Sequence, residues 1–509
     1  MMRNPRRFLA ALLGALFVVS SACQPETPPP PTSFTFNGGG FGHGVGMSQY
    51  GALGRAQAGH VAADILSAYF PNSKLEEREL GPIRVHLADA TSTDLINPTG
   101  PILMTAGTTT LSMTAAGQTL RVSQRGGRVA TQNLATEAGP TERGDAVWFS
   151  SQDSEIITVS ATGKSYRHGR LQTTVASGRV RIVESDLPME QYLYGLAEVP
   201  TSWPIEALKA QAIAGRSYAA IRLAAPKSGD FDIYSTTVDQ VYSGTAVTDA
   251  GPTGAAWREA VDQTEKLVLT HNGKVVQAYY SSSNGGHTEV PDYVWASALP
   301  YLNAAPDPFD AVAANPNASW QRTYTAEELG AWISAAGYGN VGVVTGFAVR
   351  NPVGTSGRVD KAGITVTGTA GTATLTGNQL RAAINNRVPS NRQLRSTKFT
   401  IAEAAPVDVT PPDLRFVMPE PLRYDARTGR ICAIVASSEP TIYALAIKVN
   451  GVETKSPVGG VGADAVTVMC WDLPPRSRVS RPTRVVVTGV GLDGGENYRF
   501  VQQSYTLQR

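Results

Sequence analysis

The pattern of hydrophobic and polar positions changes several times along the chain. Between about residues 81 and 183, apolar and polar residues alternate in short runs separated by Gly and Asn, which is typical of strands and turns. Residues 187–224 are rich in Ala and Leu and lack this alternation, so we expect helix there. In the mixed region that follows, Asn272-Gly273 between two apolar runs predicts a hairpin. The pattern therefore predicts an α+β fold.

Two Pro-rich segments divide the chain. Residues 23–33, CQPETPPPPTS, predict an extended tether, because consecutive prolines favour a stiff, extended backbone. Residues 403–412 are rich in proline and polar residues and predict a linker. We expect one mixed domain over 34–402, including the β-rich subdomain, and a small all-β sandwich over 413–509. A chain of 509 residues exceeds what one hydrophobic core supports, which agrees with this division.

Residues 1–22 have the composition of an export signal. Three arginines precede the apolar run Phe8–Val19, which is too short to span a bilayer as a stable helix. Small residues then lead to Cys23, a placement typical of a bacterial lipoprotein whose cysteine carries the lipid. Ser20 stands where leucine is usual, so simple secretion after the same cut is the alternative. We expect an extracytoplasmic protein that meets the membrane only through a lipid on Cys23.

The two remaining cysteines, Cys432 and Cys470, both lie in the last hundred residues beside strand-like sequence. Outside the cytoplasm such a pair forms a disulfide, which for a loop of this length stabilises the fold by about 4 kcal/mol. Two buried free thiols are the alternative.

The charge balance gives no reason to expect a nucleic-acid partner. The chain has 44 Lys and Arg against 42 Asp and Glu, whereas nucleic-acid binding needs a basic excess on one surface. Hydrophobic residues make up 42% of the chain, which supports ordinary globular burial and excludes a disordered protein.

The most unusual stretch is residues 37–51, NGGGFGHGVGMSQYG. Its glycines allow positive φ angles and a close approach of the backbone to a ligand. The stretch fits no dinucleotide fingerprint, and no Gly-Lys-Ser/Thr follows as a phosphate loop requires. The alternative is a flexible loop in which His43 is incidental.

A second stretch, residues 187–219, contains the candidate catalytic carboxylate. Pro204 suits the first turn of a helix, and Glu198 lies just before it between Leu196 and Val199. An apolar setting would raise the pKa of Glu198, as a general acid requires, whereas the helix N-terminus would favour the carboxylate. The alternative is a solvated carboxylate in a turn.

A third stretch, residues 277–289, reads QAYYSSSNGGHTE. A strand that ends in hydroxyls, an amide, glycines and a histidine predicts a polar floor for a sugar. Ordinary Ser and Asn turn chemistry is the alternative.

Taken together, the three stretches resemble the stage II sporulation protein D / amidase-enhancer LytB family, in the segments GHGVGMSQYG, EVPTSWPIEALKAQA and SSNGGHT. The resemblance covers residues 34–402 and implies a mixed catalytic domain. The family's sporulation members are lytic transglycosylases that cut the MurNAc–GlcNAc link of glycan strands, preferring strands without stem peptides. Its LytB members are described as enhancers of cell-wall amidases.

The resemblance places the catalytic acid at Glu198 and a substrate-contacting arginine at Arg216. Within the three stretches and the segment around residue 240, we expect further substrate contacts from His43, Ser48, Gln49, Gln240, Tyr242, Tyr279, Ser282, Ser283, Asn284 and Gly285.

The chain departs from the family in two respects. The GHGVGMSQ module normally lies at the C-terminal end of the domain, but here it lies at the N-terminal end. We therefore expect a circular permutation with residues 34–36 beside 399–401. Some sporulation members bind zinc through Cys and His, and the matching positions here read Tyr234, Val238 and Asp239. One carboxylate does not replace those ligands, so we expect no metal and no cofactor.

The expected function is cleavage of peptidoglycan glycan strands without water, giving a 1,6-anhydro-MurNAc end. The alternative is a non-catalytic wall-binding protein that enhances an N-acetylmuramoyl-L-alanine amidase. The expected partners are therefore glycan strands and, under the alternative, a cell-wall amidase.

Overall fold

The computed structural model describes residues 30–403, except 152–154 and 296, and between 414 and 507 the strands with a few adjoining residues. Ser33–Ala404 forms one compact unit, and the strands after residue 414 belong to a second. The secondary structure is mixed α and β, as the hydrophobic pattern predicts. The export signal, Cys23, most of the tether and the linker lie outside the described residues, so these expectations remain predictions.

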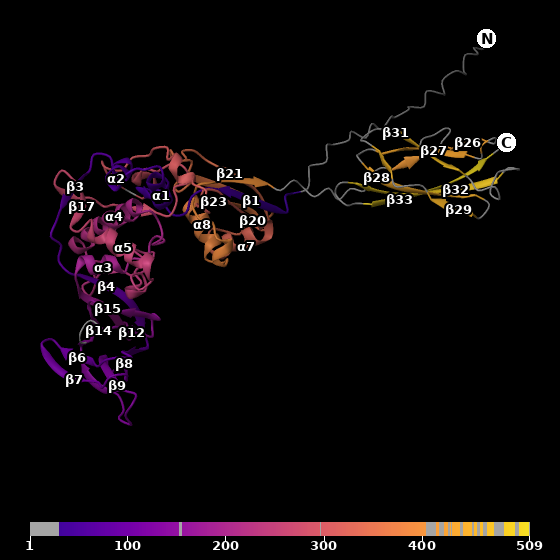
Figure 1. Cartoon of the computed structure of the whole chain (residues 1–509). Helices are drawn as coiled ribbons and strands as arrows, with labels where there is room; N and C mark the ends of the chain where they lie inside the picture. Colours follow the sequence, from indigo (N-terminus) through magenta and orange to yellow (C-terminus); the bar gives the residue numbers. More distant parts are fainter. Residues whose placement is uncertain are drawn as a thin grey trace, which may run out of the picture. The chain divides into compact units, whose positions relative to one another are not determined.

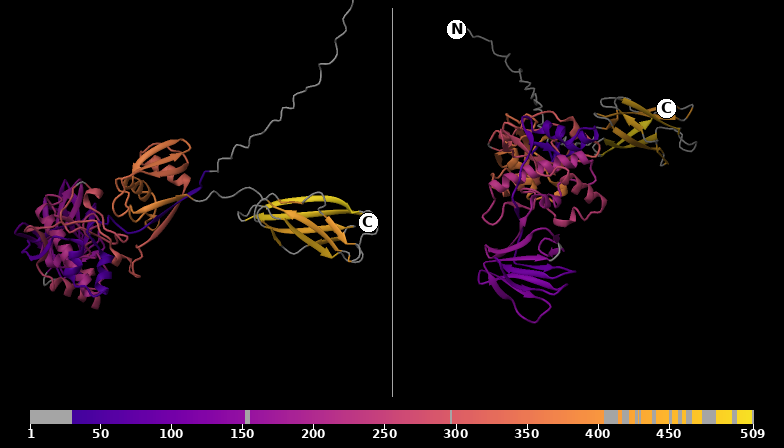
Figure 2. Two further views of the ribbon diagram at one scale, coloured as in Figure 1. Left: turned by 90° about the horizontal axis from the view of Figure 1, so that it is seen from above. Right: turned by 60° about the vertical axis from the view of Figure 1, so that its left-hand side comes forward.

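The alternating region of the sequence forms a β-rich subdomain of two sheets, drawn in purple as strands alone in the right-hand view of Figure 2. In spatial order, the first sheet is β10 (Thr141–Gly144), β9 (Arg128–Asn133), β8 (Thr119–Arg125), β5 (Ser92–Ile96), β12 (Ile157–Val159) and β13 (Lys164–Tyr166). The second is β16 (Ile233–Tyr234), β4 (Ile83–Ala90), β15 (Arg179–Leu187), β14 (Arg170–Ala176), β11 (Ala146–Ser151), β6 (Ile102–Ala106) and β7 (Thr109–Met113). Alternate residues of β4 are buried, because one face of the strand meets the core.

The helical region contains the long helix α4 (Ile205–Ala224), which carries the second sequence stretch (Figure 1). Most of its residues are buried, because it contacts other elements on several sides, and its alanines allow the close approach. Those elements are α1 (Gln49–Gln57), α2 (Ala62–Tyr69), α3 (Met189–Tyr194), α5 (Pro252–Asp262) and β17 (Leu267–His271). The remaining elements of this region and its loops are β2 (Met47–Ser48), β3 (Lys74–Glu77), η1 (Gly244–Ala246), β18 (Lys274–Val275), β19 (Tyr280–Ser281), α6 (Pro291–Val294) and η2 (Pro308–Ala311).

The predicted hairpin at Asn272-Gly273 is confirmed. β17 and β18 pair antiparallel, and both turn residues have positive φ, 52° and 73°. That combination is the one a two-residue hairpin turn requires.

A third region of the same unit has its own hydrophobic core. It contains β1 (Ser33–Gly38), β20 (Trp320–Thr325), α7 (Ala326–Ala335), β21 (Val344–Val349), β22 (Gly363–Gly368), β23 (Gly371–Thr376), α8 (Gly377–Asn385), η3 (Ser390–Arg392) and β24 (Phe399–Glu403). β1 lies between β20 and β24, with Phe36 opposite Ile401. The expectation that residues 34–36 and 399–401 are neighbours is therefore confirmed, whereas the permutation of the family's order stays a prediction.

The C-terminal unit consists of two sheets that share one core. One sheet holds β25 (Arg415–Phe416), β26 (Leu422–Asp425), β27 (Arg430–Ala436) and β31 (Val466–Asp472). The other holds β28 (Thr441–Val449), β29 (Val452–Lys455), β30 (Gly459–Val461), β32 (Thr483–Asp493) and β33 (Tyr498–Leu507). Cys432 and Cys470 lie directly opposite each other on β27 and β31 and form a disulfide, with Cα atoms 3.9 Å apart. The predicted bond is confirmed.

Candidate active site

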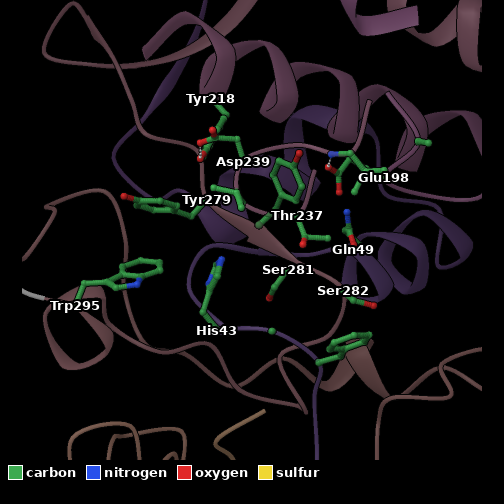
Figure 3. Close-up of a pocket in the computed structure, with 16 residues that line it drawn as sticks. His43, Gln49, Glu198, Tyr218, Thr237, Asp239, Tyr279, Ser281, Ser282 and Trp295 are labelled. Carbon is green, nitrogen blue, oxygen red and sulfur yellow. Dashed lines mark hydrogen bonds between the residues drawn. The ribbon is translucent and has the colours of Figure 1, made fainter. Parts of the chain in front are cut away.

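The three unusual sequence stretches meet at one pocket of about 450 Å³ (Figure 3). The Gly-rich loop, the turn before α4, a segment before η1 and the end of β19 all contribute. Its lining is Phe41, Gly42, His43, Gln49, Ala197, Glu198, Tyr218, Thr237, Val238, Asp239, Val241, Tyr279, Tyr280, Ser281, Ser282 and Trp295.

The Gly-rich loop packs closely against the segment around β19. Gly42 has a φ of 100°, and a Cβ there would lie 2.7 Å from the Cβ of Ser281. Gly46 has a φ of 72°, and a Cβ there would lie 2.1 Å from the carbonyl oxygen of Tyr279. These two glycines are therefore needed for contact between two protein segments, in a backbone conformation that other residues rarely adopt.

A buried carboxylate, Asp310, holds the two Gly-containing stretches together. It accepts hydrogen bonds from the hydroxyls of Ser48 at 2.5 Å and Ser283 at 2.7 Å. The backbone N–H groups of Asn284 and Gly285 donate to the same carboxylate at 3.2 and 3.0 Å. These four residues, expected to contact substrate, lie behind the pocket wall and do not line it. No sequence signal marks Asp310, because it lies outside the three unusual stretches, in the short helix η2.

Glu198 projects into the pocket from the turn between α3 and α4 (Figure 3). Its side chain is half-buried, and the backbone N–H of Val241 donates to Oε1 at 2.5 Å. Burial raises the pKa of the Glu198 carboxyl, while hydrogen bonds from Val241, Tyr280 and Gln49 act in the opposite direction. Desolvation outweighs these donors, so the pKa of Glu198 lies above its usual value, which is the direction that a general acid needs.

Tyr280 connects Glu198 to a buried chain of hydrogen bonds. The Tyr192 hydroxyl donates to Gln240 Oε1 at 2.9 Å, and Gln240 Nε2 donates to the Tyr280 hydroxyl at 2.8 Å. Since Tyr280 accepts from Gln240, its own proton is free to go to the Glu198 carboxylate. Gln240 is completely buried behind the pocket wall, so it acts through Tyr280 and does not touch a ligand.

His43 lies on an aromatic side of the pocket with Trp295 and Tyr279, whose ring centroids are 4.9 and 6.0 Å from the imidazole. Burial and the nearby Arg358 guanidinium lower the pKa of His43 to about 3. The backbone N–H of Val45 donates to Nδ1 at 3.0 Å, so the neutral ring carries its proton on Nε2. His43 is therefore a neutral hydrogen-bond donor at physiological pH.

Asp239 is the second carboxylate of the lining, and three groups already engage it. Tyr218 donates its hydroxyl at 2.7 Å, the Tyr234 backbone N–H donates at 3.1 Å, and the Lys227 ammonium lies 3.1 Å away. Among the described residues, no cluster of three or more His, Cys, Asp or Glu side chains is placed to hold a metal ion.

Five of the expected site residues line the pocket, namely Glu198, His43, Gln49, Tyr279 and Ser282. Arg216 does not. Its side chain is fully buried and makes a forked ion pair with Glu190, at 3.0 and 2.5 Å, with a further bond to the carbonyl of Leu267 at 3.1 Å. The expectation that Arg216 reaches the cleft is corrected by this position, because its guanidinium is occupied inside the protein.

Tyr242 is also buried away from the pocket, where its hydroxyl donates to Glu184 at 2.7 Å. Conversely, Tyr280, Asp239 and Trp295 line the pocket, although sequence reasoning did not select them as ligand contacts. Tyr280 adjoins Tyr279 in the third stretch, and this aromatic pair was the one available signal.

Comparison with known proteins agrees with the site. Residues 177–271, which include Glu198, match the family model described as Stage II sporulation protein. The chain is 39% identical over 136 residues to the Amidase enhancer of Bacillus subtilis (strain 168), covering 26% of this chain and 16% of that protein. It is 31% identical over 191 residues to Stage II sporulation protein D of the same organism, covering 34% of this chain and 53% of that protein. Stage II sporulation protein D of Bacillus amyloliquefaciens is 29% identical over 188 residues, with the same coverage.

The chain thus spans about half or less of the length of these curated relatives. The matches and the motifs around the pocket make this domain similar to proteins named for sporulation and for amidase enhancement. The resemblance to the SpoIID/LytB family is confirmed by the family-model match over residues 177–271 and by these relatives.

Proposed function

We propose that this protein is a peptidoglycan lytic transglycosylase and that Glu198 is its general acid and base. The observation that carries the proposal is a single carboxyl with a raised pKa on the wall of a pocket that also presents aromatic rings. Aromatic faces such as Tyr279 and Trp295 suit the apolar faces of sugar rings, and the hydroxyls of Ser281 and Ser282 suit the sugar hydroxyls.

Glu198 performs both proton transfers. The protonated carboxyl donates to the glycosidic oxygen as the bond from this oxygen to C1 of MurNAc breaks. The resulting carboxylate accepts the proton of the MurNAc C6 hydroxyl as that oxygen bonds to C1. The products are a 1,6-anhydro end and a free GlcNAc hydroxyl, no water is consumed, and the carboxyl regains its starting form.

The surroundings of Asp239 support one catalytic carboxylate instead of two. A glycoside hydrolase commonly uses a pair of carboxyl groups, either ~5 Å or ~6.5–9.5 Å apart. Asp239 accepts from two donors and pairs with Lys227, so its oxygens are already engaged and are poorly placed to activate water. The structure of the pocket therefore favours internal attack over hydrolysis.

The enhancer role is the second candidate, and the 39% identity to a protein named Amidase enhancer favours it. Mass spectrometry of glycan strands digested by the purified protein distinguishes the two. New 1,6-anhydro ends support the lyase. Strands that stay unchanged while an added amidase works faster support the enhancer and overturn the lyase.

We further propose that the protein works outside the cytoplasm, held to the membrane by a lipid on Cys23. The export-like residues 1–22 and their family setting support this placement. In the part of the chain that the structure describes, no helix has the length and apolar character needed to cross a bilayer. Metabolic labelling with a radioactive fatty acid tests the proposal, because Cys23→Ala should abolish the label.

A further inference from the structure

A second groove, of about 740 Å³, adjoins the same two chain segments as the first pocket. Its lining is Asn37, Gly38, Gly39, Gly285, Ala318, Ser319, Trp320, Gln321, Gly357, Lys398, Phe399 and Thr400. The Gly-rich loop passes from this groove at Asn37–Gly39 to the first pocket at Phe41–His43. The segment that begins at the end of β19 also lines both cavities: Ser281 and Ser282 line the first pocket, and Gly285 lines the groove. One pair of segments therefore separates the two cavities.

This shared wall is fixed by backbone hydrogen bonds. Phe41 and Ser283 exchange a pair of them, at 2.8 and 3.2 Å. The N–H of Gly39 donates to the carbonyl of Lys398 at 3.0 Å, and the N–H of Gly40 to that of Asn317 at 2.7 Å. The groove is consequently preformed, which lowers the entropy cost of binding a ligand.

The groove has a lysine without a direct ion-pair partner in its lining. The half-buried Lys398 ammonium donates to the carbonyl of Gly285 at 2.6 Å, and among the described residues it has no carboxylate within ion-pair distance. Burial and the neighbouring Arg358 lower the pKa of Lys398. An ammonium in this position gains more than an exposed one from an added carboxylate, because little water competes for it.

Further cations nearby also lack carboxylate partners within the described part of the chain. The guanidinium of Arg358 is fully buried and donates to the carbonyl oxygens of Gly42, at 3.0 Å, and Asn284, at 3.4 Å. The neighbouring arginines likewise donate only to carbonyl or amide oxygens; they are Arg322, Arg381 and Arg395. Asp360, Glu289 and Asp310 offset part of these charges from beyond ion-pair distance. Lys398 lines the groove, so it is the cation that a bound anion can meet there.

We propose that this groove is a second subsite for the glycan strand and binds the lactyl carboxylate of a MurNAc residue through Lys398. The amides of Asn37 and Gln321 stand exposed in its lining, together with the hydroxyls of Ser319 and Thr400, as contacts for sugar hydroxyls. The proposal rests on glycan strands being the substrate. In this proposal Lys398 binds the anionic group of the sugar, which the buried Arg216 cannot reach.

The test measures binding of peptide-stripped glycan oligomers by calorimetry, with Glu198→Gln as the common background so that the ligand stays intact. The comparison ligand is the same oligomer with its lactyl carboxylates reduced to alcohols. We expect the background protein to bind the native oligomer at least about tenfold more tightly than the reduced one. Lys398→Gln should lose this preference, and Lys398→Arg should keep most of it, because an arginine retains the charge.

Two further variants separate charge recognition from damage to the fold. Lys361→Gln is the matched control, since Lys361 is an exposed lysine of the same region that donates to a backbone carbonyl, that of Asp292. It should bind both oligomers as the background does. Gln321→Glu adds a negative charge at an exposed position of the groove and should weaken binding of the native oligomer only.

Equal binding of native and reduced oligomers by the background protein would overturn the subsite, as would an unchanged preference in both Lys398→Gln and Gln321→Glu. These outcomes are independent of the reaction. If the protein prefers the native oligomer but produces no anhydro ends, the subsite is supported and the lyase activity is overturned. If it produces anhydro ends without this preference, the lyase activity is supported and the subsite is overturned.

Discussion

Glu198 and Asp239 line the same pocket, and their hydrogen bonds assign them different chemistry. Asp239 pairs with Lys227 and accepts a hydrogen bond from Tyr218, so its oxygens are engaged within the protein. Glu198 has no cation partner among the described residues, and burial raises its pKa. Under the proposed function, Glu198 is the proton donor and Asp239 is held by contacts within the protein, which is the distinction that a one-carboxylate mechanism needs.

Replacing Glu198 with Gln should lower the rate of anhydro-MurNAc release by about 10²–10⁴-fold, because the amide keeps the shape but transfers no proton. The measurement is liquid chromatography with mass spectrometry of digested strands over time. Asp239→Asn is the comparison, and it should leave more activity. Wild-type release by Glu198→Gln would show that another group performs the chemistry.

Tyr280→Phe should move the alkaline limb of the pH–rate profile to higher pH. The Tyr280 hydroxyl donates to the charged form of Glu198 and so holds its pKa down. Without that donor the carboxylate is less stable, the pKa rises further, and the carboxyl stays protonated to a higher pH. The acid is needed in its protonated form, so activity persists further into the alkaline range.

The control for this shift is Tyr279→Phe, which removes a hydroxyl from the same pocket that does not reduce the pKa of Glu198. Its profile should keep the wild-type midpoint. A limb that moves to lower pH in Tyr280→Phe would contradict the proposed direction of the hydrogen bond.

At the scale of elements, the ion pair between Arg216 and Glu190 joins α4 to α3. Arg216 has no exposed surface, and Glu190 also accepts from the backbone N–H of Lys266 at 3.2 Å. The pair therefore fixes the two helices whose connection carries Glu198. Under the proposed function, the ion pair affects activity only by holding these two helices in place.

Glu190→Ala should reduce the free energy of unfolding by about 3 kcal/mol, because it leaves a buried guanidinium without its anion. Urea denaturation followed by circular dichroism measures the change. Lys209→Met, which breaks the partly exposed pair with Glu206, should cost less than about 1 kcal/mol. If Glu190→Ala keeps full stability but loses glycan binding, the positional role is wrong and Arg216 contacts the substrate.

At the scale of the whole molecule, the chain folds as two units with separate cores. Within the first, β1 and β24 pair along five residues, so the two ends of this unit meet in one sheet. Adjacent ends are the geometry that a circular permutation requires. The disulfide belongs entirely to the second unit.

Replacing Cys432 and Cys470 with Ser should destabilise the C-terminal unit by about 4 kcal/mol, given the sequence separation of 38 residues. Differential scanning calorimetry should show one transition moving to lower temperature while that of Ser33–Ala404 stays in place. Movement of both transitions would mean that the two units unfold together.

Local features of this protein could be predicted from its amino-acid pattern alone. Alternation of apolar residues predicted the strands between 81 and 183, because one face of each strand meets a core. Asn272-Gly273 fixed a hairpin, since few other pairs accept its φ angles. The neighbouring positions of residues 34–36 and 399–401 followed from motif order. The apolar neighbours of Glu198 in the sequence predicted its raised pKa.

Only the tertiary structure decided which motif residues face the cavity. Arg216, Ser48 and Ser283 lie in the expected stretches, yet their side chains bind carboxylates of the protein itself. Arg216 pairs with Glu190 of the same stretch, and the two serines donate to the buried Asp310. Nothing in a local pattern reveals Asp310, 262 positions after Ser48, because its partners are chosen by folding. A motif fixes the residue types available, and long-range packing determines which of them remain free to meet a ligand.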